Sequence, residues 1–67
     1  MILLTKREQQ VRDGILAALH NREIAYRLRI SERTVKFHAG NVYLKYGIAG
    51  PPRRKRTELL AKFKVAS

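Results

Sequence analysis

Apolar residues recur along this chain at helical spacing in four separate stretches. The first stretch consists of Val11, Ile15, Ala18 and Leu19. Their spacing of i, i+4, i+7 and i+8 predicts an amphipathic helix. Thr5 and Glu8 stand three positions apart just before this stripe, in the pattern of a capping box. We therefore expect the first helix to begin at Thr5, with Gly14 inside it at a cost of up to ~1 kcal/mol relative to alanine.

The segment from residue 21 to residue 47 predicts two helices that meet at a sharp corner. Apolar residues of the first of these helices are Ile24, Ala25 and Leu28, and those of the second are Val35, Ala39, Val42 and Tyr46. Only three residues separate the two helices, and Ser31 is suited to be the N-cap of the second. Asn21 is the corresponding candidate at the start of the first. Ala25 allows close approach of the crossing helices, so the pattern is that of a helix-turn-helix.

Two positions control how these helices end. Arg29 stands at the corner, where many such turns carry glycine, and a left-handed backbone there costs an L-residue roughly 1 kcal/mol. Either the turn differs or the fold tolerates this strain. Gly47 follows the last apolar position of the longer helix and is a candidate C-cap. We expect the longer helix to span about residues 32–46.

The C-terminal third of the chain begins with Gly50, Pro51 and Pro52, followed by four consecutive basic residues. We interpret residues 48–56 as a basic loop, because glycine and two prolines interrupt regular structure. A short apolar stripe over about residues 57–65 then predicts a fourth helix or, as the alternative, a frayed tail. The predicted fold is all-α: a small four-helix bundle that contains a helix-turn-helix, forming one domain over residues 1–67.

The charge of the chain indicates a polyanionic partner. The 67 residues include 15 Lys and Arg but only 5 Asp and Glu, which gives a net charge of +10 and a pI near 11.0. A chain of this size has a modest core, and without cysteine it has neither disulfides nor thiolate metal sites. The apolar start, MILL, is too short for a membrane span or a signal peptide, so we expect a cytoplasmic protein.

The sequence shows no pattern typical of an enzyme. It has no Ser/His/Asp grouping and no glycine-rich phosphate loop, and His20 and His38 are too far apart for a metal-ligand motif. We expect no catalytic site, no metal and no cofactor.

Several motifs together resemble the LuxR/GerE-type DNA-binding domain of bacterial transcription regulators. They are LTKRE at 4–8, NREIAYRL at 21–28, ISERTVKFH at 30–38, the single residues Asn41, Lys45 and Gly47, and RTELL at 56–60. The resemblance covers nearly the whole chain and is more specific than a bare helix-turn-helix. It implies a third helix that enters the major groove of double-stranded DNA and a fourth helix that pairs two copies. RNA polymerase is a further candidate partner.

The resemblance also assigns roles to residues of this chain. The candidates for base contacts are Lys36, Phe37, Gly40 and Asn41. Lysine can donate to guanine O6 and N7, which makes Lys36 the first candidate. The candidates for phosphate contacts are Asn21, Arg22, Arg33, Thr34, His38, Lys45, Arg53 and Arg54. The candidates for dimerisation are Leu59, Leu60 and Phe63. Some of these residues could have a purely structural role instead of contacting DNA. Lys36 and Lys45 could simply form a solvated helix face, and His38 could be a partly buried histidine.

Two features depart from the family pattern. Gly40 stands in mid-helix where relatives carry a small polar or basic residue, which removes one possible base contact. The segment AGPPRRK lies as an apparent insertion before RTELL. Its basic residues are candidates for contacts with phosphates or the minor groove, and the alternatives are a solvated loop or a nuclear localisation signal, against which the bacterial resemblance argues.

Three other functions compete with sequence-selective DNA binding. A sigma-factor-like promoter-recognition domain also uses a basic helix-turn-helix. An RNA or ribosome-associated module would use the positive charge together with Tyr26, Tyr43 and Tyr46 as stacking residues. A cationic membrane-surface peptide fits least, because the apolar residues fall into several short capped helices.

Overall fold

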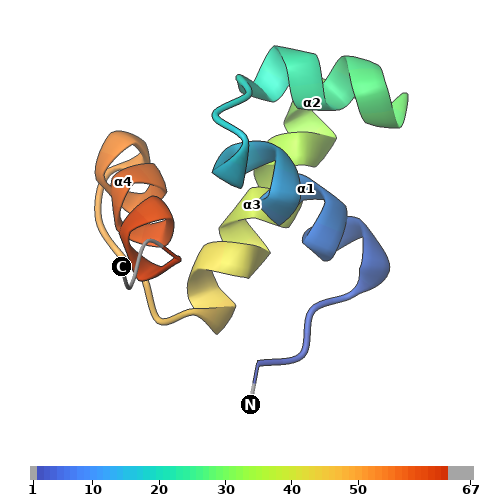
Figure 1. Ribbon diagram of the computed structural model, residues 1–67. Coiled ribbons are helices and arrows are strands. Elements are labelled where there is room, and N and C mark those ends of the chain that lie inside the picture. The colour runs from blue at the N-terminus through green and yellow to red at the C-terminus, as the bar shows by residue number, and fades with distance from the viewer. Residues whose placement is uncertain (1, 64–67) are drawn as a thin grey trace.

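The computed structural model describes residues 2–63, which form four helices (Figure 1). These are α1 (Lys6–Leu16), α2 (Asn21–Leu28), α3 (Glu32–Lys45) and α4 (Pro52–Lys62). Both α1 and α2 pack against α3, and α4 lies beside α1 at the edge of the molecule. The described residues contain no strand, which confirms the predicted all-α class with a helix-turn-helix. The last predicted positions of the fourth helix, 64 and 65, lie outside the described residues.

The predicted capping box begins α1. The Thr5 hydroxyl accepts from the Glu8 N–H at 3.1 Å, and the Glu8 carboxylate accepts from the Thr5 N–H at 3.0 Å. Two backbone donors that have no partner within the helix are thereby satisfied. The prediction of this helix start is confirmed.

Three of the helices end with the same backbone motif. After each, one residue adopts a left-handed conformation: Ala18 (φ 63°), Arg29 (φ 58°) and Gly47 (φ 70°). The next residue then donates its N–H back across the last turn, as Leu19 does to the Gly14 carbonyl at 3.0 Å. This is the Schellman motif, which satisfies helix-end carbonyls. Because α1 ends in this way at Leu16, our prediction that Ala18 and Leu19 continue the helix was wrong.

The corner of the helix-turn-helix forms around Arg29 and Ser31. Arg29 tolerates the left-handed conformation, because its N–H and that of Ile30 both bond to α2 carbonyls. The Ser31 hydroxyl accepts from the Thr34 N–H at 3.0 Å, which confirms Ser31 as the N-cap of α3. The N-cap of α2 is His20 instead of Asn21: the Glu23 carboxylate accepts from the His20 N–H at 3.0 Å.

The core lies between α1, α2 and α3 and extends to α4. Its buried residues are Val11, Ile15, Ile24, Ala25, Val35, Ala39, Val42, Tyr43, Ile48 and Leu59. Gly14 permits the close approach of α2, because a Cβ at this position would lie 2.7 Å from Ile24 Cγ1. The predicted apolar stripe of α3 included Tyr46 but not Tyr43. The structure reverses this order: Tyr43 belongs to the core and is 8% exposed, whereas Tyr46 is only partly buried.

The residues predicted as a basic loop are largely helical. Pro51 is the N-cap of α4 and Pro52 is its first residue, so the first turn carries Arg53, Arg54 and Lys55. Proline is well suited to the first helical turn, since it lacks a backbone N–H, which is not needed there, and its φ is already close to the helical value. The prolines therefore start a helix. The connection between α3 and α4 comprises only residues 46–51.

Candidate nucleic-acid interface

One face of α3 is directed outward, opposite the residues that pack in the core. Arg33, Lys36 and Phe37 are exposed on this face, and Gly40 and Asn41 one turn later are partly exposed. Because side chains three and four positions apart share a helix face, the structure brings all four predicted base-contact residues together. At 1.5 Å per residue the 14 residues of α3 extend about 21 Å, and an α-helix fits the major groove of B-DNA. We call Lys36, Phe37, Gly40 and Asn41 the reading face.

Phe37 is the most prominent apolar residue of the reading face. Its side chain is 63% exposed and contacts the His38 ring edge-on, with the ring centroids 5.5 Å apart. His38 is itself partly buried, and its predicted phosphate contact stays a prediction. An exposed phenyl ring on a basic surface is suited to contact the methyl group of a thymine.

Side chains and backbone at the start of α3 form a polar cluster. Thr34 places its hydroxyl 2.9 Å from Ser31 Oγ, so this hydroxyl is already engaged within the cap. Arg22 reaches across from α2 to Glu32, with 3.9 Å between Nε and Oε2. That ion pair is exposed, and exposed pairs contribute little to stability. The Arg22 side chain, which is 88% exposed, thus lies near the positive end of the α3 dipole, and the predicted phosphate contacts of Arg22 and Thr34 stay predictions.

Lys45 has a different contact from the one predicted. Its ammonium lies 2.7 Å from Glu8 Oε1 and joins the end of α3 to the start of α1. Glu8 is buried, and the hydrogen bond from Lys45, followed by that from the Thr5 backbone, lowers the pKa of its carboxyl. Lys45 therefore has a structural partner that the sequence did not predict, and its phosphate role stays a prediction. The 37 positions between the two residues hid this pair from sequence reasoning.

Arg53 and Arg54 point in different directions from the first turn of α4. Arg54 lies 4.0 Å from Glu58, one turn further along the helix, and its side chain passes close to Gly50. Arg53 is exposed and borders the space between α4 and α3. Arg56 donates a hydrogen bond to the Leu19 carbonyl, which ties α4 to the connection between α1 and α2. Sequence reasoning placed Lys55 and Arg56 in a loop, as candidates for contacts with phosphates or the minor groove, and did not foresee the bond from Arg56 to Leu19.

The three predicted dimerisation residues occupy three different environments. Leu59 is 0% exposed and belongs to the core, so it has no surface to offer a second copy, and this assignment is corrected. Leu60 is partly buried. Phe63 is 46% exposed, with its ring edge-on to Tyr46 and the Arg12 guanidinium over its face at 5.7 Å. Adjacent side chains of a helix point in different directions, so only one of two neighbouring leucines can face the core.

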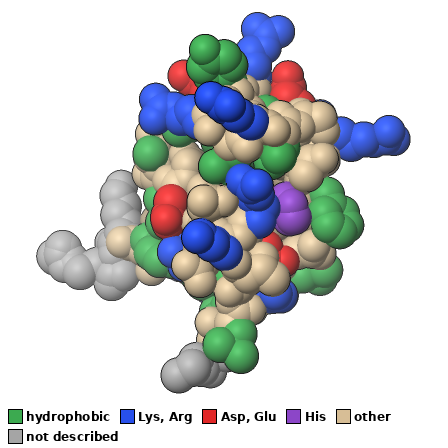
Figure 2. Space-filling model, turned by 90° about the vertical axis from the view of Figure 1, so that its right-hand side faces the viewer, with side chains coloured by type: hydrophobic (Ala, Val, Ile, Leu, Met, Phe, Trp, Pro, Cys, Tyr) green, Lys and Arg blue, Asp and Glu red, His purple; other side chains and the backbone are tan. Residues whose placement is uncertain are grey.

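Lys and Arg side chains are distributed over the molecular surface (Figure 2). Figure 2 shows them spread singly over one face, with some acidic side chains among them. The described residues contain no group of three or more His, Asp or Glu placed to hold a metal ion. Within residues 2–63, no helix is long and apolar enough to cross a membrane.

Comparison of the amino-acid sequence with known proteins identifies the family of this chain. A family described as GerE, bacterial regulatory proteins of the luxR family, matches residues 3–52. The chain belongs to this family. The match contains α1, α2, α3 and the reading face, and it ends at the first residue of α4.

Individual relatives agree with the family match. The chain is 42% identical over 60 residues to the transcriptional regulatory protein FixJ of Rhizobium meliloti, and 43% identical over 58 residues to FixJ of Azorhizobium caulinodans. These alignments cover 90% and 87% of this chain but only 29% and 28% of the relatives. The spore germination protein GerE of Bacillus subtilis is 44% identical over 48 residues, which is 72% of this chain and 65% of GerE. No solved structure gave a significant match.

Family membership confirms the functional class predicted from the sequence. The luxR family comprises DNA-binding domains of transcriptional regulators and is not a family of enzymes. It also decides between the two helix-turn-helix alternatives, in favour of the regulator and against the sigma-factor-like domain.

Proposed function

We propose that this chain binds double-stranded DNA sequence-selectively, with α3 in the major groove, as the DNA-binding part of a transcriptional regulator. The observation that carries the proposal is the reading face: Lys36 and Phe37 stand exposed beside Gly40 and Asn41 on the second helix of a helix-turn-helix, in a chain of net charge +10. A regulator of this kind acts at the bacterial chromosome, so a cytoplasmic location belongs to the proposal. Contact with RNA polymerase stays a prediction.

Each residue of the reading face has a distinct role in this proposal. Lys36 donates to guanine O6 and N7, Phe37 contacts a thymine methyl, and Asn41 bonds a base edge or a phosphate. Gly40 offers no side chain, and a Cβ there would meet nothing within 4 Å, so it lets the DNA approach the helix backbone. Specificity therefore depends strongly on Lys36.

Cationic and polar residues around the reading face set the position of the helix on the duplex. We assign this role to Asn21, Arg22, Arg33, Thr34, His38 and Arg53. Phosphate contacts position a protein without reading sequence. If about five of them form per copy, the logarithm of the binding constant falls with the logarithm of salt concentration at a slope near −4 to −5, at ~0.9 per phosphate.

A second copy binding through the end of α4 would double the DNA site. The exposed ring of Phe63 and the partly buried Leu60 offer the apolar surface for this contact. Two-fold related copies bind half-sites about one helical turn apart, so the spacing of an inverted repeat would report the dimer. Sedimentation of the chain with and without duplex measures its assembly state directly.

Replacement of Lys36 by alanine tests the role of the reading face. We expect Lys36→Ala to lose ~1–3 kcal/mol on the preferred site and much less on unrelated duplexes. Lys6→Ala is the matched control, because it removes the same charge from an exposed position at the start of α1. Fluorescence anisotropy at one salt concentration measures the affinity of both variants for each duplex. If both variants lost the same affinity on every duplex, the proposal that α3 reads the base sequence would be refuted.

RNA binding is the second candidate, supported by one observation. Tyr26 is 86% exposed on α2, with Arg22 one turn before it and Arg29 close after it. Stacking of unpaired bases on aromatic and guanidinium planes is typical of single-stranded RNA recognition. Preference for single-stranded RNA over duplex DNA, abolished by Tyr26→Ala, would favour this alternative.

A further inference from the structure

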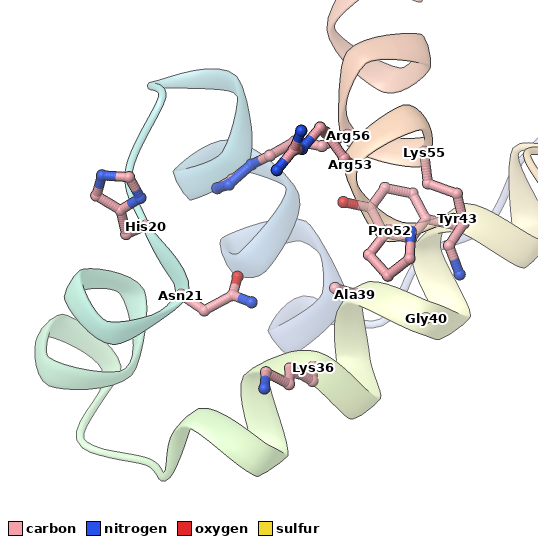
Figure 3. A pocket seen from close by; sticks show the side chains of 10 residues that line it. All are labelled: His20, Asn21, Lys36, Ala39, Gly40, Tyr43, Pro52, Arg53, Lys55 and Arg56. Carbon is pink, nitrogen blue, oxygen red and sulfur yellow. The ribbon is translucent and has the colours of Figure 1, made fainter. Parts of the chain in front are cut away.

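A cavity of about 680 Å³ lies between the first turn of α4, the middle of α3 and the connection between α1 and α2 (Figure 3). Asn21 points into it from one side, while Arg53 and Arg56 extend toward it from α4. Lys36 and Gly40 of the reading face form another part of its border. Its volume is in the range of sites that hold small molecules. We call this space the basic cavity.

The charge around the basic cavity is entirely positive. Lys36, Arg53, Lys55 and Arg56 all line it, and no Asp or Glu is among its lining residues. Two acidic groups on the surrounding helices have partners of their own: Glu58 pairs with Arg54, and Glu23 accepts from the His20 backbone. Converging cations without a counter-charge raise the local concentration of anions.

Two of the cations are held in place before any ligand arrives. Arg56 donates to the Leu19 carbonyl, and the Lys55 ammonium lies 5.5 Å from the centroid of the Tyr43 ring. Guanidinium has five N–H donors, so Arg56 keeps donors available after this bond. A planar fork of donors fixed in this way matches the oxygens of a phosphate.

The wall of the cavity beside these cations consists of residues with small side chains or none. Ala39 and Gly40 line it, and a Cβ on Gly40 would have no neighbouring atom within 4 Å. Burial raises the pKa of the Tyr43 hydroxyl, so this group stays protonated and able to donate a hydrogen bond. The cavity thus offers cationic and neutral donors around a space that a bulky residue at position 40 would reduce.

We propose that the basic cavity is a phosphate-binding site in which Arg53 and Arg56 are the main ligands and Lys36 borders the entrance. The phosphate has two sources with the same chemistry. One is the backbone of a DNA strand lying beside α3, and this part rests on the proposed function. The other is a free phosphorylated molecule of nucleotide size, which would then compete with DNA, because Lys36 serves both.

Adjacent arginines provide the matched variants for the test. Arg53 lines the cavity, whereas Arg54 carries the same charge on the same turn but lies against Glu58. Arg53→Ala and Arg54→Ala therefore remove equal charge and differ in site. Circular dichroism and thermal unfolding establish that both variants fold like the unaltered chain, as their exposed positions predict.

The first arm of the experiment titrates pyrophosphate into the ¹⁵N-labelled chain at constant ionic strength. We expect saturable shifts of the Asn21, Gly40 and Arg56 amide signals, with binding at least fivefold weaker in Arg53→Ala and within twofold of the original in Arg54→Ala. The second arm measures the affinity of the same variants for duplex DNA. A larger loss for Arg53→Ala than for Arg54→Ala is the expected result there.

The two arms distinguish the sources and can overturn the proposal. A selective effect of Arg53→Ala on pyrophosphate supports a free phosphorylated ligand, and a selective effect on DNA alone supports the strand backbone. If Arg53→Ala and Arg54→Ala had equal affinities in both arms, the proposed phosphate-binding site would be refuted. If the unaltered chain bound no DNA, the proposed function would fail, while the pyrophosphate arm would still decide the cavity.

Discussion

Two glycines inside helices should respond in opposite directions to the same substitution. A Cβ at Gly14 of α1 would lie 2.7 Å from Ile24 Cγ1 and 2.9 Å from Cδ1, well inside an ordinary carbon contact of about 3.5–4.0 Å. Ile24 is 2% exposed and packed in the core, so it has little room to move. A Cβ at Gly40 of α3 would meet nothing within 4 Å.

The magnitudes follow from two opposing effects. Glycine to alanine in a helix interior gains up to ~1 kcal/mol in either helix. Overpacking a filled core costs ~1–3 kcal/mol, and this applies only at Gly14. We therefore expect Gly40→Ala to raise the free energy of unfolding by up to ~1 kcal/mol and Gly14→Ala to lower it by about 1 kcal/mol. The helix-propensity gain cancels in the comparison, so the two variants should differ by ~1–3 kcal/mol.

Urea unfolding followed by circular dichroism measures this difference. Thermal unfolding gives an independent value, since 1 kcal/mol shifts the Tm of a domain this small by about 4–8 °C. If Gly14→Ala proved as stable as Gly40→Ala, the close packing of α1 on α2 would be refuted. The orientation of the helix-turn-helix on α1 would then need another explanation.

Three further predictions concern contacts that hold the domain together. The Lys45 hydrogen bond lowers the Glu8 pKa, so the stability contributed by Glu8 is full above its ordinary value of 4.5 and is lost as pH falls through the lower folded-state pKa. Glu8→Gln should flatten this acid-side loss in unfolding curves recorded at several pH values. Arg29→Gly should stabilise by up to ~1 kcal/mol, because glycine adopts φ 58° without strain; a lower Tm would contradict this. Leu59→Ala should cost ~2–5 kcal/mol in urea unfolding and Leu60→Ala distinctly less, and the reverse order would contradict the assigned burial.

Local patterns in the sequence were enough to predict the helix-turn-helix. The capping box at Thr5 and the N-cap at Ser31 involve residues three positions apart, so the chain itself specifies them. The residues of the reading face were taken from the family resemblance; that they share one face follows from helix geometry, and their contact with bases stays a prediction. Arg29 at the corner shows a limit: the sequence raised the question of strain, and only the backbone angle answered it.

Contacts between distant parts of the chain could not be predicted. Lys45 was assigned to DNA because nothing near it in sequence reveals the bond to Glu8. The burial of Tyr43 could not be predicted, because it depends on where α4 packs, and the start of α4 at Pro52 was itself predicted as loop. Arg53 and Arg54 are indistinguishable in sequence, yet one lines the basic cavity and the other pairs with Glu58.

Selection from a pool of random duplexes at near-physiological salt tests the central claim most directly. Sequencing of the retained DNA should reveal a short enriched motif for the unaltered chain, and Lys36→Ala should lose preference at one or more of its positions. An inverted repeat within the motif would also report a two-fold dimer. Retention of DNA without any enriched motif, weakened equally for all sequences by added salt, would contradict sequence-selective reading and leave only non-specific polyanion binding.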